Sequence, residues 1–393
     1  MTSAAAEPDR PRGGWPEGLL DAAWLWLVLR VGLGLFAAAL VIRGGLPSPC
    51  AADIAQNGWT TFPPLDDQGL LFPLVGVWQR WDACWYAKVA TFGYEPGVSS
   101  TAFFPLFPAL MGAAGRILGG HMALGGMVVN ALALVVALTG LWRLVGRDFG
   151  PAVADRTVLY VAVFPVAFFL FAPFTESIFL ACAVWSILGA RERRWGIVAV
   201  AGLLAGLTRP QGIFLLLPLG WEAWSAIRET RTRSPGPLAA LTPAIGFAAF
   251  YVYTSAVVGR SLLDAQLLWA GTGFQAPLDA LAAGVARIET KADAVTALNL
   301  VALGLFSVLF LAGLRRLPAS YSLYVLPNLA LIFVRAPAIP LMSTMRFCLV
   351  LFPCFVVLAL AGRRRRLHEA WVVISVLFLG LLSAMFLEGR FIG

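Results

Sequence analysis

The feature that most constrains this chain of 393 residues is the recurrence of apolar runs long enough to cross a lipid bilayer. They continue from Trp24 to Leu387, and no long polar segment separates them. Inside a bilayer every backbone polar group must be paired within the protein, so such runs predict helices. The composition agrees, because 60% of the residues are hydrophobic and only 13% are charged. We therefore predict an all-α, polytopic integral membrane protein with about 10–12 transmembrane helices.

The predicted spans are separated mostly by short loops. We place them near residues 24–42, 123–145, 158–171, 174–190, 196–207, 213–227, 238–258, 294–313, 321–334, 347–361 and 370–387. Several are shorter than the ~20 residues of an ordinary span, and flanking Trp, Tyr and Arg side chains can reach the interface to extend them. No small-residue cleavage site follows the first run, so we interpret it as an anchor and not as a signal peptide.

The rest of the chain divides into a tail and one domain. Residues 1–20 are predicted to be a disordered cytoplasmic tail, because the start of the chain is polar and rich in Pro and Gly. Residues 21–393 are predicted to form a single transmembrane domain. Within it, residues 43–120 make a long first extracytoplasmic loop with interfacial or re-entrant helices.

Basic residues determine the predicted orientation. Most of the Lys and Arg residues, which give the net charge of +8, fall in short loops, and such loops stay in the cytoplasm. We therefore expect no nucleic-acid partner. With the spans above, the basic clusters lie inside, the N-terminus is inside and the C-terminus is outside. These clusters are Arg143/Arg147/Arg156, Arg191/Arg193/Arg194, Arg228/Arg231/Arg233, Arg315/Arg316 and residues 363–366.

Residues 101–118 are apolar enough to be a further span. Counting them as one would place the cluster around Arg143 outside and reverse every later loop, unless an additional crossing existed elsewhere. Pro105 and Pro108 interrupt the segment, and Pro breaks a helix by removing a backbone donor. We therefore interpret it as a re-entrant or interfacial segment.

The few Cys and His residues argue against a metal or haem site. The five cysteines form no CxxC pair, and there are only two histidines. Cys182, Cys348 and Cys354 fall in apolar spans and are expected to be packing residues. Cys50 and Cys84 share the first outer loop; they permit a disulfide there without specifying one.

Asp82 is the first candidate for a functional residue. If residues 78–86 are helical, Trp78, Asp82 and Trp85 share one stripe with Trp81 at its edge. The closely spaced tryptophans predict an interfacial helix on the outer membrane surface. A carboxylate on such an aromatic face loses hydration, which is costly unless the group is paired or used. The alternative is a structural Asp that bonds a neighbouring loop.

Three more charges lie at the same predicted face. Glu176 precedes a span, where Thr175 could cap the helix and the Glu could favour the positive end of its dipole. Arg209 and Arg346 lie on the outside, where the charge bias does not explain them. They are either anchors that reach the interface or ligands for a phosphate at the membrane surface. No nucleotide-phosphate loop is present, so a phosphate substrate would be lipid-borne.

Several motifs resemble one enzyme family. Residues 80–86 (RWDACWY), Gly93-Tyr94 and residues 103–108 (FFPLFP) resemble the start of the PIG-V type mannosyltransferases, which add the second mannose in GPI-anchor synthesis and have bacterial relatives. Residues 174–177 (FTES), 208–212 (TRPQG) and 343–347 (STMRF) are similar to later motifs of that family, in the same order. The similarity spans most of the chain, but a long lumenal elaboration is missing, so a GPI acceptor does not follow.

The resemblance implies a GT-C glycosyltransferase of the plasma membrane with an extracytoplasmic active site. The implied donor is a polyprenyl-phosphate sugar, usually mannose, and the acceptor is a glycan or glycolipid. An inverting transfer from phosphate needs mainly one base, which would be Asp82. Glu176 would orient the acceptor or support that base, and Arg209 or Arg346 would stabilise the phosphate charge.

The remaining implied roles concern substrate contacts. Trp81, Trp85 and Tyr86 could stack on sugar faces, Gln211 is a further substrate-binding candidate, and membrane lipid surrounds the spans. The scheme needs no cofactor or metal, although Asp82 with Glu176 could hold a metal ion.

Two alternatives share these features. A transporter or lipid flippase would also have many spans and isolated charges, but it predicts internal repeats and charges near the bilayer midplane. No clear repeat is visible in the sequence, and the unusual charges lie at one face, which favours an enzyme. A transferase of the same fold could also use another sugar, such as arabinose or glucose.

The predicted orientation is testable by accessibility labelling of single cysteines introduced by substitution. Cysteines at Asp67 and Gly273 should react with an impermeant thiol reagent added outside, because both are predicted to be extracytoplasmic. Cysteines at Arg193 and Arg365 should react only after permeabilisation. Labelling of the Arg193 position from outside would overturn the orientation.

Overall fold

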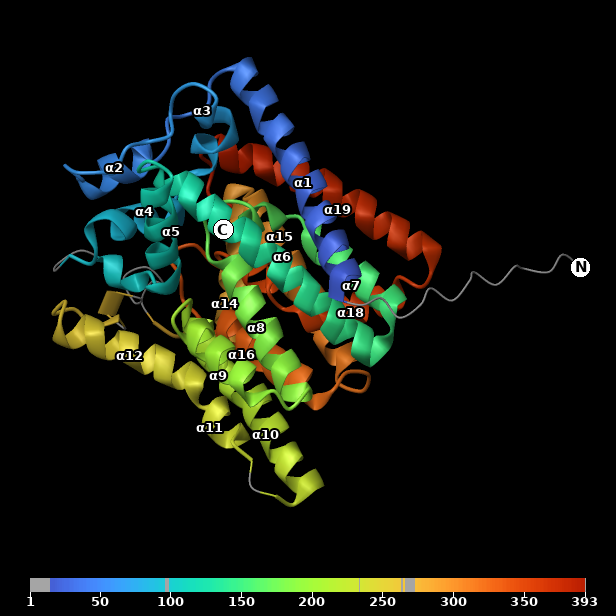
Figure 1. Cartoon of the computed structure of the whole chain (residues 1–393). Helices are drawn as coiled ribbons and strands as arrows, with labels where there is room; N and C mark the ends of the chain where they lie inside the picture. Colours follow the sequence, from blue (N-terminus) through green and yellow to red (C-terminus); the bar gives the residue numbers. More distant parts are fainter. Residues whose placement is uncertain (1–14, 96–98, 233, 263, 266–272, 393) are drawn as a thin grey trace, which may run out of the picture.

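The computed structural model is a bundle of helices (Figure 1) and describes all residues except 1–14, 96–98, 233, 263, 266–272 and 393. Over the described residues the regular elements are helices, with one isolated antiparallel bridge between Phe274 and Arg335. The all-α fold class is therefore confirmed. Most of the predicted tail lies outside the described residues, but its last part is helical, because the first helix already begins at Trp15.

The helices carry the labels of Figure 1. In residues 43–120, predicted to be extracytoplasmic and called the first outer segment below, they are α2 (Ala51–Asn57), α3 (Leu71–Leu74), η1 (Gly76–Trp78), α4 (Asp82–Phe92), η2 (Ser99–Ala102) and α5 (Leu106–Ile117). The others are α1 (Trp15–Arg43), α6 (Met122–Phe149), α7 (Pro151–Ala162), η3 (Ala167–Leu170), α8 (Glu176–Arg191), α9 (Trp195–Gly206), η4 (Pro210–Leu215), α10 (Leu216–Thr230), α11 (Gly236–Ala240), α12 (Thr242–Ala256), α14 (Pro277–Lys291), α15 (Ala294–Gly313), α16 (Ala319–Val334), α17 (Thr344–Leu349), α18 (Phe352–Ala361) and α19 (Arg365–Leu387).

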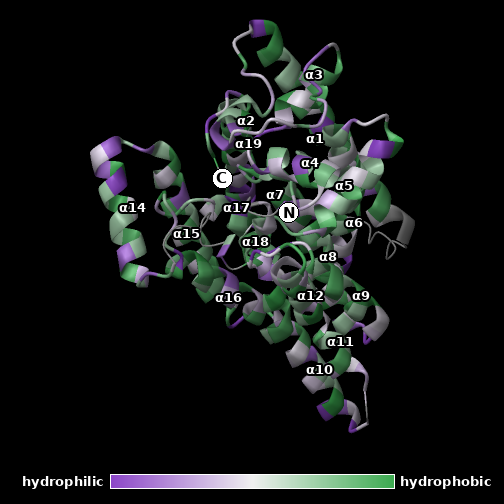
Figure 2. Ribbon diagram, turned by 90° about the vertical axis from the view of Figure 1, so that its left-hand side faces the viewer, coloured by the Kyte–Doolittle hydropathy of each residue, from purple (hydrophilic) through white to green (hydrophobic). Residues whose placement is uncertain are grey.

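Four of the described helices are long and apolar enough to cross a membrane, namely α1, α6, α15 and α19. Shorter apolar helices, among them α5, α9, α16 and α18, lie beside them. The chain is thus a polytopic membrane protein, and the exact number of spans stays a prediction. Figure 2 shows green, hydrophobic residues over most helices, whereas α14 stands apart with hydrophilic residues along it.

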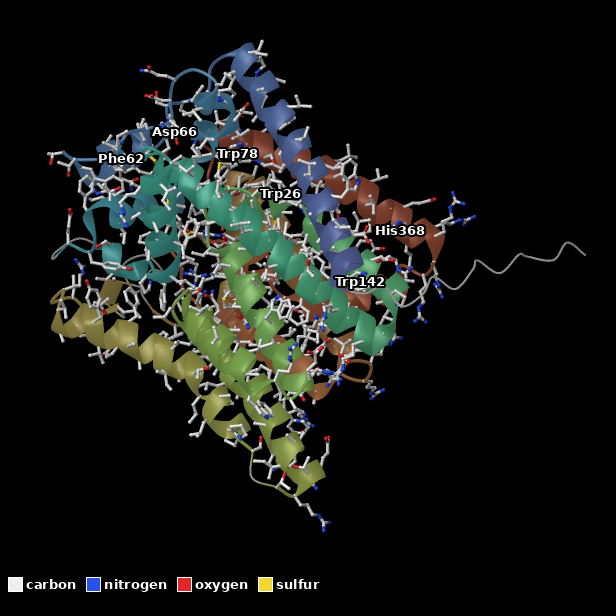
Figure 3. All side chains as sticks on the ribbon, viewed as in Figure 1. Trp26, Phe62, Asp66, Trp78, Trp142 and His368 are labelled. Carbon is white, nitrogen blue, oxygen red and sulfur yellow. A yellow bond between two sulfur atoms is a disulfide. The ribbon has the colours of Figure 1, made fainter. Side chains whose placement is uncertain are left out.

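The two ends of the molecule carry different segments. In Figure 3, Phe62 and Asp66 of the first outer segment lie at one end, together with Trp78. Trp142 and His368, which adjoin two of the basic clusters, lie toward the other end. This separation agrees with a first outer segment and basic loops on opposite sides of a membrane, and the absolute orientation stays a prediction.

Some predicted spans are interrupted helices. The span predicted at 158–171 is wrong in its second half: α7 ends at Ala162 and is followed by the short η3, in a stretch that contains Pro165 and Pro173. The span predicted at 347–361 is divided into α17 and α18, with Pro353 in the first turn of α18. Proline lacks the N–H needed inside a helix, and these interruptions place non-helical backbone within the bundle.

Residues 101–118 contain the end of the short η2 and one α-helix, α5, of 12 residues. At 1.5 Å per residue it is roughly 18 Å long, shorter than the ~30 Å hydrocarbon core of a bilayer. The helix packs against α6, and glycines allow the close approach: a Cβ placed on Gly125 would lie 2.4 Å from the nitrogen of Gly115. This geometry agrees with a re-entrant segment, which stays a prediction.

The first outer segment is fastened to the bundle at several points. A disulfide joins Cys50, which precedes α2, to Cys84 in α4, with the Cα atoms 5.7 Å apart. Arg30 of α1 donates to the carbonyl of Leu74 and lies 6.0 Å from the ring centroid of Trp78. Arg30 is therefore partly explained as an anchor for the outer segment.

We predict that the substitution Gly125→Ala destabilises the protein by about 1–3 kcal/mol, because the added Cβ meets backbone atoms of α5 that cannot move aside. Thermal unfolding followed by circular dichroism measures the effect. Gly304→Ala in α15 is the control, since a Cβ there meets nothing within 4 Å. Equal melting temperatures for the two variants would contradict close α5–α6 packing.

Candidate active site

Asp82 is presented by a turn that the sequence pattern did not predict. The predicted helix over 78–86 is wrong, because η1 ends at Trp78 and α4 begins only at Asp82. Between them, Trp81 has φ 53° and ψ −122°, and the main-chain amide of Ala83 donates to the carbonyl of Arg80 over 3.0 Å. Asp82 therefore opens its helix directly after a reversal of the chain.

The helix α4 is also not an interfacial surface helix. Its residues from Ala83 to Val89 are buried, so its tryptophan belongs to the protein interior and not to a membrane surface. Asp82 itself keeps 30% of its side chain exposed. The carboxylate thus lies at the rim of a buried region and is accessible to solvent.

Glu176 occupies the first position of α8 and is fully buried. Thr175 precedes it but forms no side-chain cap, so the capping interpretation does not account for this residue pair. The loop before α8 is held from α6, where the amide of Asn130 donates to the carbonyls of Ala172 and Phe174. The buried carboxylate is thereby fixed at the end of its helix.

Two arginines from distant parts of the chain bind Glu176. Arg209, which precedes η4, donates from Nη1 to Oε1 over 2.9 Å, and Arg346 in α17 donates from Nε to the same oxygen. Arg346 also donates from Nη1 to Oδ2 of Asp82 over 2.5 Å. One guanidinium therefore bridges the two carboxylates that the sequence singles out.

Aromatic rings enclose this cluster. The guanidinium carbon of Arg346 lies 5.0 Å and 4.7 Å from the ring centroids of Phe169 and Phe174. That of Arg209 lies 5.7 Å from the ring of Phe347. Because the rings exclude water, the charged groups can be stabilised only by one another. A buried charge that loses its partner strongly destabilises the folded state.

A third arginine, Arg335, was not predicted from the sequence as a site residue. Its guanidinium carbon lies 4.8 Å from the ring of Phe347, the ring that also faces Arg209. Among the described residues no carboxylate lies within ion-pair distance of it. Burial and, to a smaller extent, the positive charges of Arg209 and Arg346 together lower the pKa of Arg335 to about 10. The site therefore contains a guanidinium that lacks a counter-charge.

The other predicted substrate residues have different surroundings. The ring of Trp85 stacks on Phe103 at 5.2 Å, and Tyr86 packs edge-on against Phe103 and Phe107. Protein side chains cover both rings, which are buried packing residues of α4. Stacking on a sugar remains a prediction for the half-buried Trp81 alone.

Gln211 lies in η4, two residues after Arg209. The residue is buried, and its side-chain oxygen has no hydrogen-bond partner among the described residues. It therefore stays a candidate for binding a polar group near Arg209.

The space between Asp82 and Glu176 is not arranged for a metal. Arg346 lies between the two carboxylates and bonds both, so a cation could bind there only if that guanidinium moved. In the described part of the chain, no three His, Cys, Asp or Glu side chains gather as a metal-binding group.

We predict that Glu176→Gln destabilises the protein by about 3–5 kcal/mol, because two buried guanidinium groups lose their shared counter-charge. The melting temperature in detergent, compared with wild type, measures the effect. Glu369→Gln is the matched control: its pair with Arg365 is formed by side chains 53% and 90% exposed, and such a pair contributes under ~1 kcal/mol. If Glu176→Gln melts like the control, the buried cluster is not stabilising the native state as described.

The chain matches no protein-family model and no curated protein. Among solved structures it is similar to crystal structures of the oligosaccharyltransferase of Archaeoglobus fulgidus. They are a complex with zinc and sulfate (15% identity, TM-score 0.43), a form tethered through a disulfide to an acceptor peptide with the NVT sequon (12%, 0.46) and an apo form (14%, 0.42).

The matches cover 96%, 95% and 94% of this chain and 53%, 56% and 56% of the respective archaeal chains. The chain thus spans about half the length of the structures it matches. Similarity of this extent carries no information about activity or substrate.

Proposed function

We propose that this protein is an inverting glycosyltransferase of the GT-C type. It moves a mannosyl residue from a polyprenyl-phosphate donor to a lipid-linked or glycan acceptor at the extracytoplasmic face of the plasma membrane. The observation that supports the proposal best is the bridge from the part-exposed Asp82 through Arg346 to the buried Glu176. A carboxylate held in one orientation at the rim of a helical bundle is what a general base requires.

The geometry leaves Asp82 free to take a proton. Arg346 bonds Oδ2, and no described residue forms a hydrogen bond with Oδ1. Glu176 is fully buried, so it cannot meet an acceptor directly in this arrangement. Its role in the proposal is to fix Arg346, which in turn orients Asp82.

The reaction then needs only one base. The acceptor hydroxyl passes its proton to Asp82 as its oxygen forms a bond with the anomeric carbon. The bond from that carbon to the phosphate oxygen breaks, and the electron pair leaves with the prenyl phosphate. Because phosphate leaves as an anion without being protonated, no general acid is needed. The configuration inverts because the acceptor oxygen attacks in a single displacement, on the face opposite the phosphate.

Arg335 is suited to the departing phosphate. Arg209 and Arg346 each donate to Glu176, so part of their positive charge is already compensated. Arg335 has no such partner among the described residues, and Arg209 uses only Nη1 on Glu176. The two guanidinium groups around Phe347 can together bind a phosphate.

The transporter or flippase alternative and the use of another sugar predict different outcomes. A flippase would move a prenyl lipid without cleaving it. A same-fold transferase would cleave a donor with a different sugar, and would release prenyl phosphate from that donor instead of from the mannose form. Assays that detect the released lipid, the transferred sugar and the donor sugar separately distinguish all three.

We predict that Asp82→Asn lowers transfer of labelled mannose from polyprenyl-phosphate mannose by about 100- to 10,000-fold. The amide keeps the shape of the side chain but cannot accept the proton. Donor binding, measured separately on the purified variant, should be retained. Asp67→Asn, an exposed position of the same outer segment, should transfer like wild type.

Wild-type turnover by Asp82→Asn would remove Asp82 from the chemistry. Loss of folding together with activity would favour the purely structural interpretation of this residue.

We also predict that Arg335→Ala lowers kcat/KM for the donor by about 10- to 100-fold, because a hydrogen bond to a charged group contributes about that factor. Kinetics with varied donor should show the loss, while the KM for the acceptor stays within a factor of ~2. Because Arg335 has no ion pair with a described residue, Arg335→Ala should lower the melting temperature less than Arg209→Ala. Arg116→Ala, an exposed arginine at the end of α5, is the control, and equal donor kinetics in the two variants would exclude Arg335.

A further inference from the structure

The turn that precedes Asp82 has a conformation that its central residue does not favour by itself. With φ 53° and ψ −122°, Trp81 takes the first central position of a type II′ turn, and the amide of Ala83 closes that turn on the carbonyl of Arg80 over 3.0 Å. Glycine is the usual residue there, because a Cβ is crowded at such angles. Trp81 therefore keeps this conformation only because its surroundings impose it.

Arg80, at the first position of the turn, has a buried side chain that is bonded to two distant segments. Its Nη1 donates to the carbonyl of Ser48 over 2.8 Å, and its Nη2 donates to the carbonyls of Pro47 and Leu387 over 2.7 and 3.1 Å. Pro47 and Ser48 lie between α1 and α2, and Leu387 is the last residue of α19. One guanidinium thus joins the turn to the start of the first outer segment and to the end of α19.

The main chain and a disulfide fasten the same neighbourhood. The amide of Cys50 donates to the carbonyl of Gln79 over 3.3 Å, just before the turn. The disulfide joins Cys50 to Cys84, just after it. The backbone on both sides of the turn is therefore attached to residues 47–50.

A guanidinium is suited to the position of Arg80 because its N–H donors form a rigid planar fork that can bind several carbonyls at once. Lysine carries the same charge on a single nitrogen and cannot reproduce bonds from two nitrogens. Burial, opposed by the charge of Asp53, lowers the pKa of Arg80 to about 10, so the group stays positively charged at neutral pH. Arg80 can therefore fix the chain more sharply than another cation.

The contact of Asp82 with Arg346 depends on this fixed start. Asp82 follows Arg80 by two residues, and its Oδ2 accepts from Nη1 of Arg346 over 2.5 Å. A displacement of about 1 Å along that bond would take it out of hydrogen-bond range.

We propose that Arg80 is a positioning residue: its fork of hydrogen bonds imposes the strained turn that places the carboxylate of Asp82 beside Arg346. The consequence for catalysis rests on the proposed function, whereas the hold on the turn does not depend on it.

The first test is a double-mutant cycle of thermal unfolding in detergent, which needs no enzymatic assay. Asp82→Asn should lower the melting temperature in the native background, because Arg346 loses a charged partner. In an Arg80→Ala background the same change should lower it less than about half as much, since Asp82 no longer lies beside Arg346. Equal effects in the two backgrounds would overturn the hold of Arg80 on the turn.

Arg156→Ala is the matched control for the cycle. Arg156 also donates to a main-chain carbonyl of another helix, from Nε to Ala359 over 3.0 Å, but it belongs to a basic cluster that is predicted to be cytoplasmic. Asp82→Asn should lower the melting temperature as much in this background as in the native one, because the two sites share no partner.

If Arg80→Ala does not fold, Arg80→Lys takes its place in the cycle, because it keeps the charge and loses the fork. A smaller effect of Asp82→Asn in that background supports the proposal, and an equal effect overturns it.

The second test is kinetic. Arg80→Ala should lower kcat for mannosyl transfer at least ~10-fold, since a misplacement of about 1 Å can cost about 100-fold. The rate is divided by the amount of donor-binding protein, which excludes a loss through unfolding. The donor KM should stay within a factor of ~2, because Arg209 and Arg335 are unchanged. Arg156→Ala should transfer like wild type, and a wild-type kcat for Arg80→Ala would overturn the proposal.

The two tests separate the failure of this inference from that of the proposed function. If wild-type protein transfers no mannose, the proposed reaction is wrong, and the unfolding cycle still decides whether Arg80 holds the turn. If transfer occurs but the cycle is additive, the proposed function stands and the role of Arg80 does not.

Discussion

The site depends on one guanidinium. Arg346 binds the fully buried Glu176 and the part-exposed Asp82, which lies 264 residues away in the sequence. Removing charges from water is costly, and the cost is recovered only if each group keeps its partner. Glu176 at the start of α8, Arg346 in α17 and Asp82 at the start of α4 must therefore arrive together for the fold to be stable. The same requirement fixes the orientation of Asp82, whose carboxylate is the part of this cluster that solvent reaches.

The first outer segment provides the frame for that carboxylate. It contains no helix long enough to cross a bilayer in its described part, and a disulfide, Arg80 and Arg30 hold it in addition to the buried apolar faces of α4 and α5. Such ties specify a position more sharply than apolar packing, because hydrogen bonds are directional. The frame ends at a strained turn, and strain of this kind is retained mainly where function requires a particular geometry.

Hydropathy predicted the helical fold because the bilayer demands apolar helices, and it located α15 to the residue. Asp82, Glu176, Arg209 and Arg346 stand out in the sequence as charges in apolar surroundings, and the structure brings these four together. Local pattern could not predict the turn at Trp81, since the aromatic spacing there fits a helix equally well. Arg335 resembles an ordinary loop residue, and only the tertiary contacts show that it shares the ring of Phe347 with Arg209.

The proposed function requires that a prenyl-linked phosphate bind beside Arg346, Glu176 and Arg209, at the end of the bundle that carries the first outer segment. The most direct measurement is a cryo-EM structure of the protein in a lipid nanodisc with a bound polyprenyl phosphate. We predict phosphate density within hydrogen-bond distance of Arg335 or Arg209, adjacent to Oδ1 of Asp82, with the prenyl chain between apolar helices. Phosphate density near the bilayer midplane, or at the end of the bundle with the basic loops, would contradict the proposed function.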